Sequence, residues 1–129
     1  MKKAQLKLLD KFKFYKGHYG NGLTFDIGDG WVDMLLEFSN RVQELIDDGI
    51  ETPEFTVVQV KSKFGGLRVY HLGCMPETED LIKEYEKKSL ETCELCGKPA
   101  KLVLFGHWYY TFCKNCTQEI INLDKPRQN

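Results

Sequence analysis

Apolar residues recur at spacings of three and four in several stretches of the chain, a pattern typical of amphipathic helices. The clearest stretch covers residues 30–48, where one side would carry Trp31, Met34, Leu35, Phe38, Val42, Leu45 and Ile46. Asp33 falls in the first turn of this helix and Gly49 just after its last turn, positions that suit the two helix ends. We expect this helix to form the core of the larger lobe.

Two further helices are predicted at residues 3–15 and 77–90. The first carries Leu8, Leu9, Phe12 and Tyr15 on one side and lysines on the rest. It is interpreted as a docked terminal helix with a solvated lysine face, although a basic helix can also contact anionic lipid or nucleic acid. The second has an acidic first turn and lysines near its end, which matches the helix dipole. Its apolar residues are Leu81, Ile82, Tyr85 and Leu90.

Between these helices the pattern changes to strands. Residues 55–64 and 67–72 are rich in β-branched and aromatic residues, and the intervening Gly65-Gly66 pair predicts a two-residue turn. The resulting hairpin, residues 55–72, would pair Phe64 with Leu67, Lys63 with Arg68 and Lys61 with Tyr70. A glycine-rich loop precedes the core helix, and residues 23–27 within it are expected to form a short edge strand.

The face of this hairpin that points away from the helix collects hydrogen-bond donors. Its members are Lys61, Lys63, Arg68 and Tyr70. Such a surface can take a phosphate, a nucleotide or an acidic protein segment. The alternative is that the long side chains extend into water, or that acidic residues of the following helix neutralise them. The sequence leaves both interpretations open.

The chemically most specific feature is a pair of CxxC motifs, formed by Cys93, Cys96, Cys113 and Cys116. Their separation fits a four-cysteine zinc site, and Gly97 supplies a permissive backbone just after the second ligand. A redox CxxC would need one exposed pair at a helix start, and structural disulfides belong to oxidising compartments. We therefore predict one structural Zn²⁺ whose closed shell leaves no position for catalysis.

The remaining cysteine and the histidines do not extend this metal site. Cys74 follows a predicted strand and is interpreted as a small buried hydrophobe. His107 lies beside Gly106 at a predicted hairpin tip between the two motifs. His18 and His71 have no carboxylate or thiol at a spacing that would identify a catalytic base. Their roles, and that of Cys74, stay open at this point.

Together the elements predict an α+β fold, in which a helix packs on a β-hairpin or small antiparallel sheet. We expect an α+β domain over residues 1–90, a zinc-ribbon-like lobe over 91–123 and a polar tail over 124–129. No apolar run approaches the roughly 18 residues that span a bilayer, and nothing at the start resembles a signal peptide. A formal net charge of −1 argues against a surface that binds nucleic acid everywhere, although a local basic patch is compatible with it. We expect a cytoplasmic protein that contacts no membrane.

Three motifs carry a resemblance to a known group of proteins. They are Gly28-Asp29-Gly30-Trp31, the stretch Gln59 to Tyr70, and the cysteine knuckle Cys93 to Gly97. In this order they resemble a family of small uncharacterised proteins of bacterial genomes and phages, over roughly residues 10–116. The resemblance implies a bacterial or phage-infected cytoplasm and no particular mechanism. In that family the second metal pair is often Cys followed by His, whereas this chain has Cys116 there.

Three classes of function are compatible with these features. The leading hypothesis is a non-enzymatic, zinc-stabilised binding module whose basic hairpin face engages an anionic partner: nucleic acid, a nucleotide or an acidic protein surface. The alternative is a phage-type inhibitor or adaptor that binds a host protein through Trp108, Tyr109 and Tyr110 at the ribbon tip. A third is a phosphate-processing enzyme with His71 beside the basic face, for which no nucleophile and base pair can be named. The sequence does not identify the partner or the oligomeric state.

Overall fold

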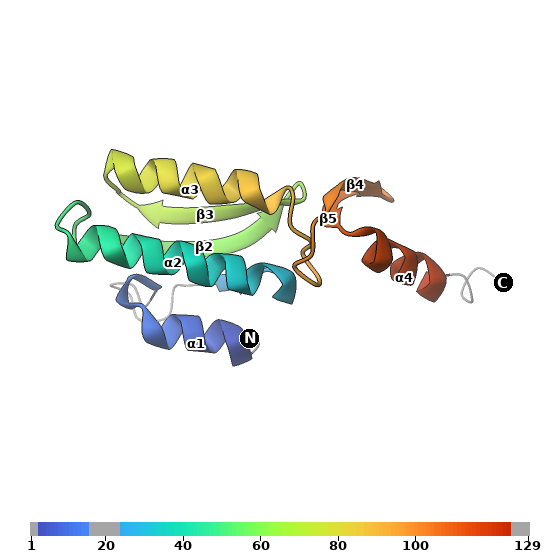
Figure 1. Cartoon of the computed structure of the whole chain (residues 1–129), viewed down its shortest axis with the longest axis horizontal. Coiled ribbons are helices and arrows are strands. Elements are labelled where there is room, and N and C mark those ends of the chain that lie inside the picture. The colour runs from blue at the N-terminus through green and yellow to red at the C-terminus, as the bar shows by residue number, and fades with distance from the viewer. Residues whose placement is uncertain (1–2, 16–23, 125–129) are drawn as a thin grey trace.

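The computed structural model describes residues 3–15 and 24–124 and shows the predicted α+β fold (Figure 1). The helical elements are α1 (Lys3–Lys11), the 3-10 turns η1 (Lys13–Tyr15) and η2 (Asp29–Trp31), α2 (Val32–Asp47), α3 (Pro76–Ser89) and α4 (Lys114–Asp124). The strands are β1 (Thr24–Asp26), β2 (Thr56–Lys63), β3 (Gly66–Leu72), β4 (Lys101–Phe105) and β5 (Trp108–Phe112). No helix in this described part is both long and apolar enough to cross a membrane.

The larger lobe is built on a three-stranded sheet with β2 in the middle. Strand β1 pairs with β2 in parallel, and β3 pairs with it antiparallel. Figure 1 shows α2 running alongside β2 and α3 running along β3. The backbone N–H of Leu67 donates to Ser89 Oγ at 2.9 Å, and that of Val69 donates to Glu86 Oε2 at 3.4 Å. Side chains of α3 thus accept hydrogen bonds from backbone N–H groups of β3, an edge strand that would otherwise be open to pairing with another strand.

The core of this lobe lies where the apolar side of α2 meets the sheet. Trp31, Leu35, Phe38 and Val42 are fully buried, as the helical spacing predicted. The start of the helix differs from the expectation, because residues Asp29–Trp31 form a 3-10 turn before α2 begins at Val32. Burial of an aromatic side chain as large as Trp31 stabilises the fold by roughly 3–5 kcal/mol.

The predicted turn of the β2–β3 hairpin is wrong by one residue. The two turn residues are Phe64 and Gly65, with φ angles of 54° and 79°, and Lys63 pairs with Gly66. Positive φ at both central positions is the geometry of a type I′ turn, which follows the natural twist of a hairpin. Each pairing therefore moves by two residues, and because side chains alternate with period two, they keep their predicted faces near the turn.

The corrected register places Lys61 directly opposite Arg68. Like charges in this position repel, but both have acidic neighbours. Asp26 of β1 is the register partner of Lys61 on its other side, and Arg68 Nη1 lies 3.9 Å from Glu86 Oε1 of α3. The neutralisation of Arg68 by the following helix was one of the two interpretations of this face.

The ribbon lobe lies at one end of the molecule, beyond the hairpin turn and the start of α2 (Figure 1). Strands β4 and β5 form a two-stranded antiparallel sheet, and α4 follows directly. Its buried centre consists of Cys93, Phe112 and Cys113, with partly buried residues such as Val103 and Ile120 around them. The closing helix α4 begins at Lys114, directly after Cys113.

Candidate metal centre and the groove beside it

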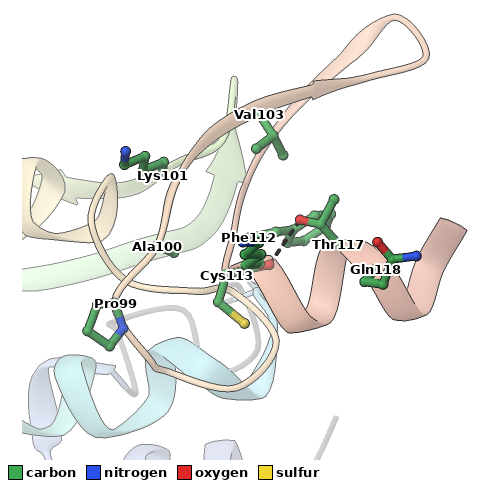
Figure 2. A pocket seen from close by; sticks show the side chains of 9 residues that line it. Pro99, Ala100, Lys101, Val103, Phe112, Cys113, Thr117 and Gln118 are labelled. Atoms are coloured by element: carbon green, nitrogen blue, oxygen red, sulfur yellow. Dashed lines mark hydrogen bonds between the residues drawn. The ribbon is translucent and has the colours of Figure 1, made fainter.

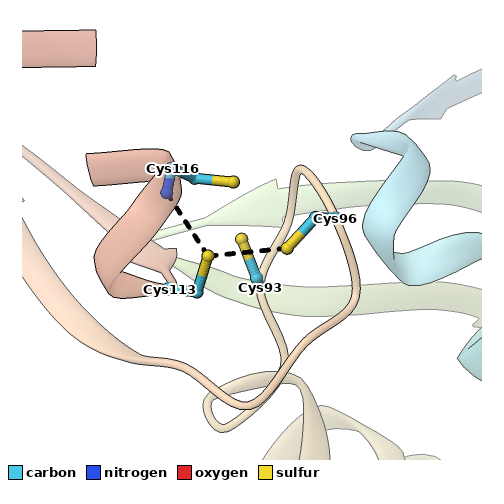
Figure 3. A group of neighbouring side chains, drawn as sticks. All are labelled: Cys93, Cys96, Cys113 and Cys116. Atoms are coloured by element: carbon cyan, nitrogen blue, oxygen red, sulfur yellow. Dashed lines mark hydrogen bonds between the residues drawn. The ribbon is translucent and has the colours of Figure 1, made fainter. Parts of the chain in front are cut away.

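The two CxxC motifs converge on one point. The Sγ atoms of Cys93, Cys96, Cys113 and Cys116 all lie within 4.8 Å of one another, and Figure 3 shows them gathered between the knuckle loop and the start of α4. The Sγ atoms of Cys96 and Cys113 are 3.5 Å apart, and the thiols are free rather than disulfide-bonded. Tetrahedral thiolates at about 2.3 Å from a zinc ion would be about 3.8 Å apart. The four cysteines are thus positioned to hold a metal ion.

Backbone geometry fixes each half of this site. In the first half, the N–H of Gly97 donates to the Cys93 carbonyl at 3.0 Å and the N–H of Cys93 donates to the Lys98 carbonyl at 2.8 Å. Gly97 has a φ of 82°, so the expectation that it permits the sharp turn is confirmed. In the second half, the backbone N–H of Cys116 donates to Cys113 Sγ at 3.4 Å. This hydrogen bond holds Cys113, which precedes α4, close to Cys116 in the first turn of the helix.

Four neighbouring thiols cannot all ionise without a compensating charge. The hydrogen bond from the Cys116 backbone lowers the pKa of Cys113 to about 7. Burial, followed by the neighbouring thiols, raises the pKa of Cys116 far above its ordinary value. A bound divalent cation removes this conflict by favouring all four thiolates. Because four protein donors complete a tetrahedron, the arrangement suits a structural ion.

The cysteine knuckle packs directly on η2, the 3-10 turn that leads into α2. The N–H of Gly30 donates to the Glu94 carbonyl at 2.9 Å, and Trp31 Nε1 donates to the Thr92 carbonyl at 2.8 Å. A Cβ atom on Gly30 would lie 2.1 Å from the Cys93 carbonyl oxygen, and one on Gly28 would lie 2.2 Å from that of Glu94. Only glycine fits at this distance, which gives the glycines before Trp31 a physical role.

The hairpin turn makes a second close contact with the ribbon. The hydroxyl of Thr111 donates to the Gly65 carbonyl at 2.6 Å. A Cβ atom on Gly65 would lie 2.4 Å from Leu102 Cδ1 and 3.2 Å from the Tyr110 backbone. The three motifs of the sequence, which lie far apart along the chain, therefore meet at one junction between the lobes.

Glu94 is a buried carboxylate at this junction that the sequence analysis did not single out. Its backbone N–H donates to the Thr111 carbonyl at 2.9 Å, and its Oε2 accepts from the Thr111 N–H at 2.7 Å. Burial raises the pKa of Glu94, and hydrogen bonds from Thr111 and Ser62 partly oppose that rise. The position of Glu94 between Cys93 and Cys96 did not indicate that its side chain is buried, because the two residues between the cysteines of a CxxC motif are normally solvent-facing spacers.

A groove of about 570 Å³ lies between the two lobes; we call it the interlobe groove. One wall comes from β1 and β2 and includes Lys61 and Lys63, and the other comes from β5 and includes Trp108, Tyr109 and Tyr110. The remaining lining residues are Asp26, Ile27, Gly28, Ser62, Phe64 and Glu94. The predicted basic hairpin face and the predicted aromatic ribbon tip are thus two walls of one groove.

Two members of the predicted basic face lie outside the interlobe groove. Arg68 is close to Glu86 of α3, as described above, and Tyr70 is the register partner of Gln59 and is 37% exposed. The four predicted residues therefore divide into a pair inside the groove, Lys61 and Lys63, and a pair beyond it. The shift in hairpin register contributes to this division, because Lys61 rather than Lys63 faces Arg68.

His71 and Cys74 lie close together on the larger lobe but outside the groove. Cys74 Sγ is 3.9 Å from His71 Nε2, and the His71 ring packs 5.8 Å from that of Phe55. Burial, with Glu51 and Glu79 nearby, raises the pKa of Cys74, which keeps the thiol protonated. This environment suits a packed cysteine rather than a nucleophile. His107 is exposed in the β4–β5 turn, and His18 lies outside the described residues.

A second groove, of about 540 Å³, lies within the ribbon between its sheet and α4 (Figure 2). Val103 and Phe112 give it an apolar floor, and Lys101 and Lys114 are at its margin. Figure 2 shows the Cys113 side chain beside it. Nothing in the hydrophobic pattern of the chain predicted this groove, because it depends on how α4 docks against the sheet.

Comparisons with known proteins add no relative. No model of a known family matches the chain. Neither the curated proteins nor the solved structures contain a match to it. The resemblance to small bacterial and phage proteins therefore stays a prediction, and the functional argument depends on the geometry of this molecule.

Proposed function

We propose that this chain is a non-enzymatic binding module, stabilised by one zinc ion, that takes an anionic partner in the interlobe groove. The observation that carries the proposal is the groove itself. It brings the predicted cationic residues Lys61 and Lys63 together with the exposed aromatic residues Trp108 and Tyr109. The bacterial or phage-infected cytoplasm implied by the resemblance is part of this proposal.

The choice of zinc follows from the donor set. Soft thiolates in a tetrahedral arrangement favour zinc or an iron–sulfur centre, and the ribbon-like hairpin between the pairs is typical of structural zinc. Native mass spectrometry and elemental analysis of the purified chain should find one zinc per molecule. Substitution with Co²⁺ should give the visible absorption of a tetrahedral thiolate complex. Fully titratable thiols in a metal-free protein would contradict the assignment.

The metal has a defined role in this function. The groove wall that carries Trp108 and Tyr109 belongs to a lobe with very few buried apolar residues. Cys113 directly follows β5 and Cys116 lies in the first turn of α4, so an ion bound by both would also hold the end of this strand. We therefore expect partner binding to require the metal, although the metal contacts no partner.

Charge reversal tests the anionic partner. Lys61→Glu with Lys63→Glu should weaken binding to a polyanion panel of heparin, polyglutamate and single-stranded oligonucleotides at least tenfold, because it removes both groove cations. Lys83→Glu with Lys87→Glu is the matched control, since both residues are exposed on α3 away from the groove. Equal losses in both variants, or no binding by the wild-type chain, would overturn the proposal.

An exposed apolar patch favours a second candidate, the adaptor that binds a host protein. Leu102 and Leu104, which share one face of β4, are 47% and 60% exposed, and Tyr109, the register partner of Leu104, is 47% exposed. Leu102 and Leu104 do not line the interlobe groove. If this candidate holds, Leu104→Asp should abolish capture of a protein from a bacterial lysate while Lys61→Glu with Lys63→Glu leaves the capture intact. If instead Lys61→Glu with Lys63→Glu abolishes the capture and Leu104→Asp leaves it intact, the result supports the anionic partner.

A further inference from the structure

We propose that the partner in the interlobe groove is single-stranded nucleic acid, held mainly by stacking of its bases on Trp108 and Tyr109. This inference rests on the proposed function and names its partner class. The phosphates would lie along the rim at Lys63. Because stacking uses the faces of bases, and every base has such a face, we expect little sequence preference.

The aromatic residues are the first support for this proposal. Trp108 is 70% exposed and Tyr109 is 47% exposed, and both line the groove. Phe64, which is 66% exposed, lines the opposite wall. Large aromatic surfaces that remain in water on both walls of one groove are available to stack with planar groups.

The backbone at Phe64 is the second support. Its φ of 54° lies in the left-handed region, which a bulky side chain rarely adopts and which glycine or asparagine adopts more easily. A phenylalanine there is strained and at the same time exposed, so it contributes little to the core. The Lys63 ammonium lies over its ring, 5.7 Å from the centroid. The turn therefore presents an aromatic face and a cation side by side.

The charge of the groove distinguishes between anionic partners. Its lining has two lysines, Lys61 and Lys63, and two carboxylates, Asp26 and Glu94. Asp26 is beside Lys61, and Glu94 is turned into the Thr111 backbone. Among the described residues, Lys63 has no carboxylate within ion-pair distance. A groove with so little net charge attracts a polyanion weakly, so contacts other than charge must supply the affinity.

This balance argues against duplex DNA and against an acidic peptide. Duplex binding depends on neutralising many phosphates, and the bases of a duplex are already stacked on one another. An acidic peptide would depend on the same few cations and would leave the aromatic faces unused. A single strand matches both features, since it offers unstacked bases and needs few phosphate contacts.

The size of the groove sets the length of strand it contacts. Its volume of about 570 Å³ is within the range of sites for small ligands, roughly 300–1,000 Å³. We therefore expect two or three bases to contact the protein, with one or two phosphates near Lys61 and Lys63. For a single strand, this number of phosphates gives a slope of log K against log salt between about −0.7 and −1.4.

The experiment uses the zinc-loaded full chain with fluorescein-labelled dT12 and rU12, measured by anisotropy between 50 and 200 mM salt. We expect both to bind with the shallow slope given above. Tryptophan emission should be quenched on binding, and the quenching reports on Trp108 because the other tryptophan, Trp31, is fully buried. Trp108→Ala should weaken binding roughly fivefold to 150-fold, the range for loss of one stacked base.

Two variants serve as controls. Trp108→Phe should retain most of the affinity, because an aromatic ring face is kept. If Trp108 had only a structural role, the affinity would not depend on whether the new side chain is aromatic. Tyr70→Ala removes an exposed aromatic side chain outside the groove and should leave binding unchanged. Tyr109→Ala provides a second removal inside the groove in case Trp108→Ala loses its metal or its fold, which zinc content and circular dichroism would show.

The outcomes separate this inference from the proposed function. If polyglutamate or heparin binds and responds to Lys61→Glu with Lys63→Glu, but dT12 and rU12 neither quench tryptophan emission nor respond to Trp108→Ala, stacking is wrong and an acidic protein partner is favoured. A salt slope much steeper than −1.4 also overturns stacking as the main contribution. If no polyanion binds at all, the proposed function itself fails. Different affinities for dT12 and rU12 would identify which single strand is preferred.

Discussion

The two lobes of this chain are stabilised in different ways. The larger lobe buries a continuous set of apolar side chains from α1, η1, α2, α3 and the sheet, including Trp31, Phe38 and Tyr85. In the ribbon lobe, the buried set consists of Phe112 and two metal-binding candidates, Cys93 and Cys113. A core of this size cannot offset the conformational entropy of about 30 residues. One lobe thus depends on hydrophobic burial, whereas the other has little buried apolar surface and four cysteines positioned to hold a metal ion.

The lobes are nevertheless in close contact. Main-chain atoms of the knuckle lie against Gly28 and Gly30, and Trp31, which belongs to the larger core, donates to the Thr92 carbonyl. Backbone contacts of this kind transmit a displacement directly, because no flexible side chain can absorb it. The smaller core is therefore positioned by the larger one, and we expect its own folding to need the metal.

Removing a metal ligand should have the largest effect on this comparison. Cys113→Ser should unfold the ribbon lobe, because structural zinc contributes about 10–16 kcal/mol of binding free energy in zinc-finger peptides, where binding and folding are coupled. Hydrogen exchange measured by mass spectrometry should show loss of protection in β4, β5 and α4 and its retention in α2 and β2. Cys74→Ser, which removes the cysteine outside the cluster, should keep both the zinc and the protection pattern. Protection that persists in β5 without metal would contradict a metal-dependent lobe, and simultaneous loss in α2 would show that the lobes unfold together.

A second substitution tests the junction. Gly30→Ala would place a Cβ atom 2.1 Å from the Cys93 carbonyl oxygen, so either α2 or the knuckle must move. We expect a loss in unfolding free energy at or above the roughly 1–3 kcal/mol typical of overpacking. The movement should also loosen the cysteines, so a chelator should remove zinc faster. Urea denaturation and chelator competition measure the two effects.

Gly73→Ala is the control for the junction substitution. Gly73 has a φ of 53°, and an added Cβ atom would have nothing within 4 Å, so alanine there costs only backbone strain, roughly 1–2 kcal/mol. It should not change the rate at which zinc is lost. If Gly30→Ala and Gly73→Ala release zinc at the same rate, the knuckle is positioned independently of α2.

Local patterns sufficed for most of the elements and for the four cysteines that are positioned to hold a metal ion. The side of α2 that is buried, the hairpin and the four cysteines each depend on spacing within a short stretch, and the structure bears them out. The turn was misplaced because Gly65-Gly66 is the stronger local signal, whereas the true turn uses Phe64 in a conformation that no sequence rule favours. Packing of Gly65 against Tyr110 is a long-range contact that could not be read from the hairpin alone.

The interlobe groove could not be predicted for the same reason. Its walls were recognised separately, as a basic hairpin face and an aromatic ribbon tip, but their proximity depends on the close approach at Gly28, Gly30 and Gly65. Glu94 was missed because its burial results from the pairing with Thr111, which exists only once the knuckle and β5 are folded together. The sequence shows where a glycine is, but it does not show which distant backbone segment that glycine contacts.

The smallest expected effect concerns the surface of the larger lobe. Tyr85 donates to Glu37 Oε1 at 2.6 Å and Lys88 Nζ lies 3.3 Å from the same oxygen, so α2 and α3 are joined by a polar network. The hydrogen bond from Tyr85, followed by that from Lys88, lowers the pKa of Glu37. Because the Glu37 and Lys88 side chains are about half exposed, Glu37→Gln should reduce the unfolding free energy by less than about 1 kcal/mol at pH 7.

The pH dependence of this effect has a definite sign. A carboxyl group whose pKa is lower in the folded state stabilises the protein above its unfolded pKa, about 4.3 for glutamate, and that contribution is lost as the pH falls through the folded value. The difference in urea midpoint between wild type and Glu37→Gln should therefore be greatest near neutral pH, decrease as the pH falls below the unfolded pKa, and disappear below the lowered folded pKa. Glu44→Gln, at an exposed position on the same helix, is the matched control for the loss of one surface carboxylate. A Glu37→Gln effect that exceeds the loss in Gly30→Ala would mean that surface charges, rather than burial, hold the larger lobe together.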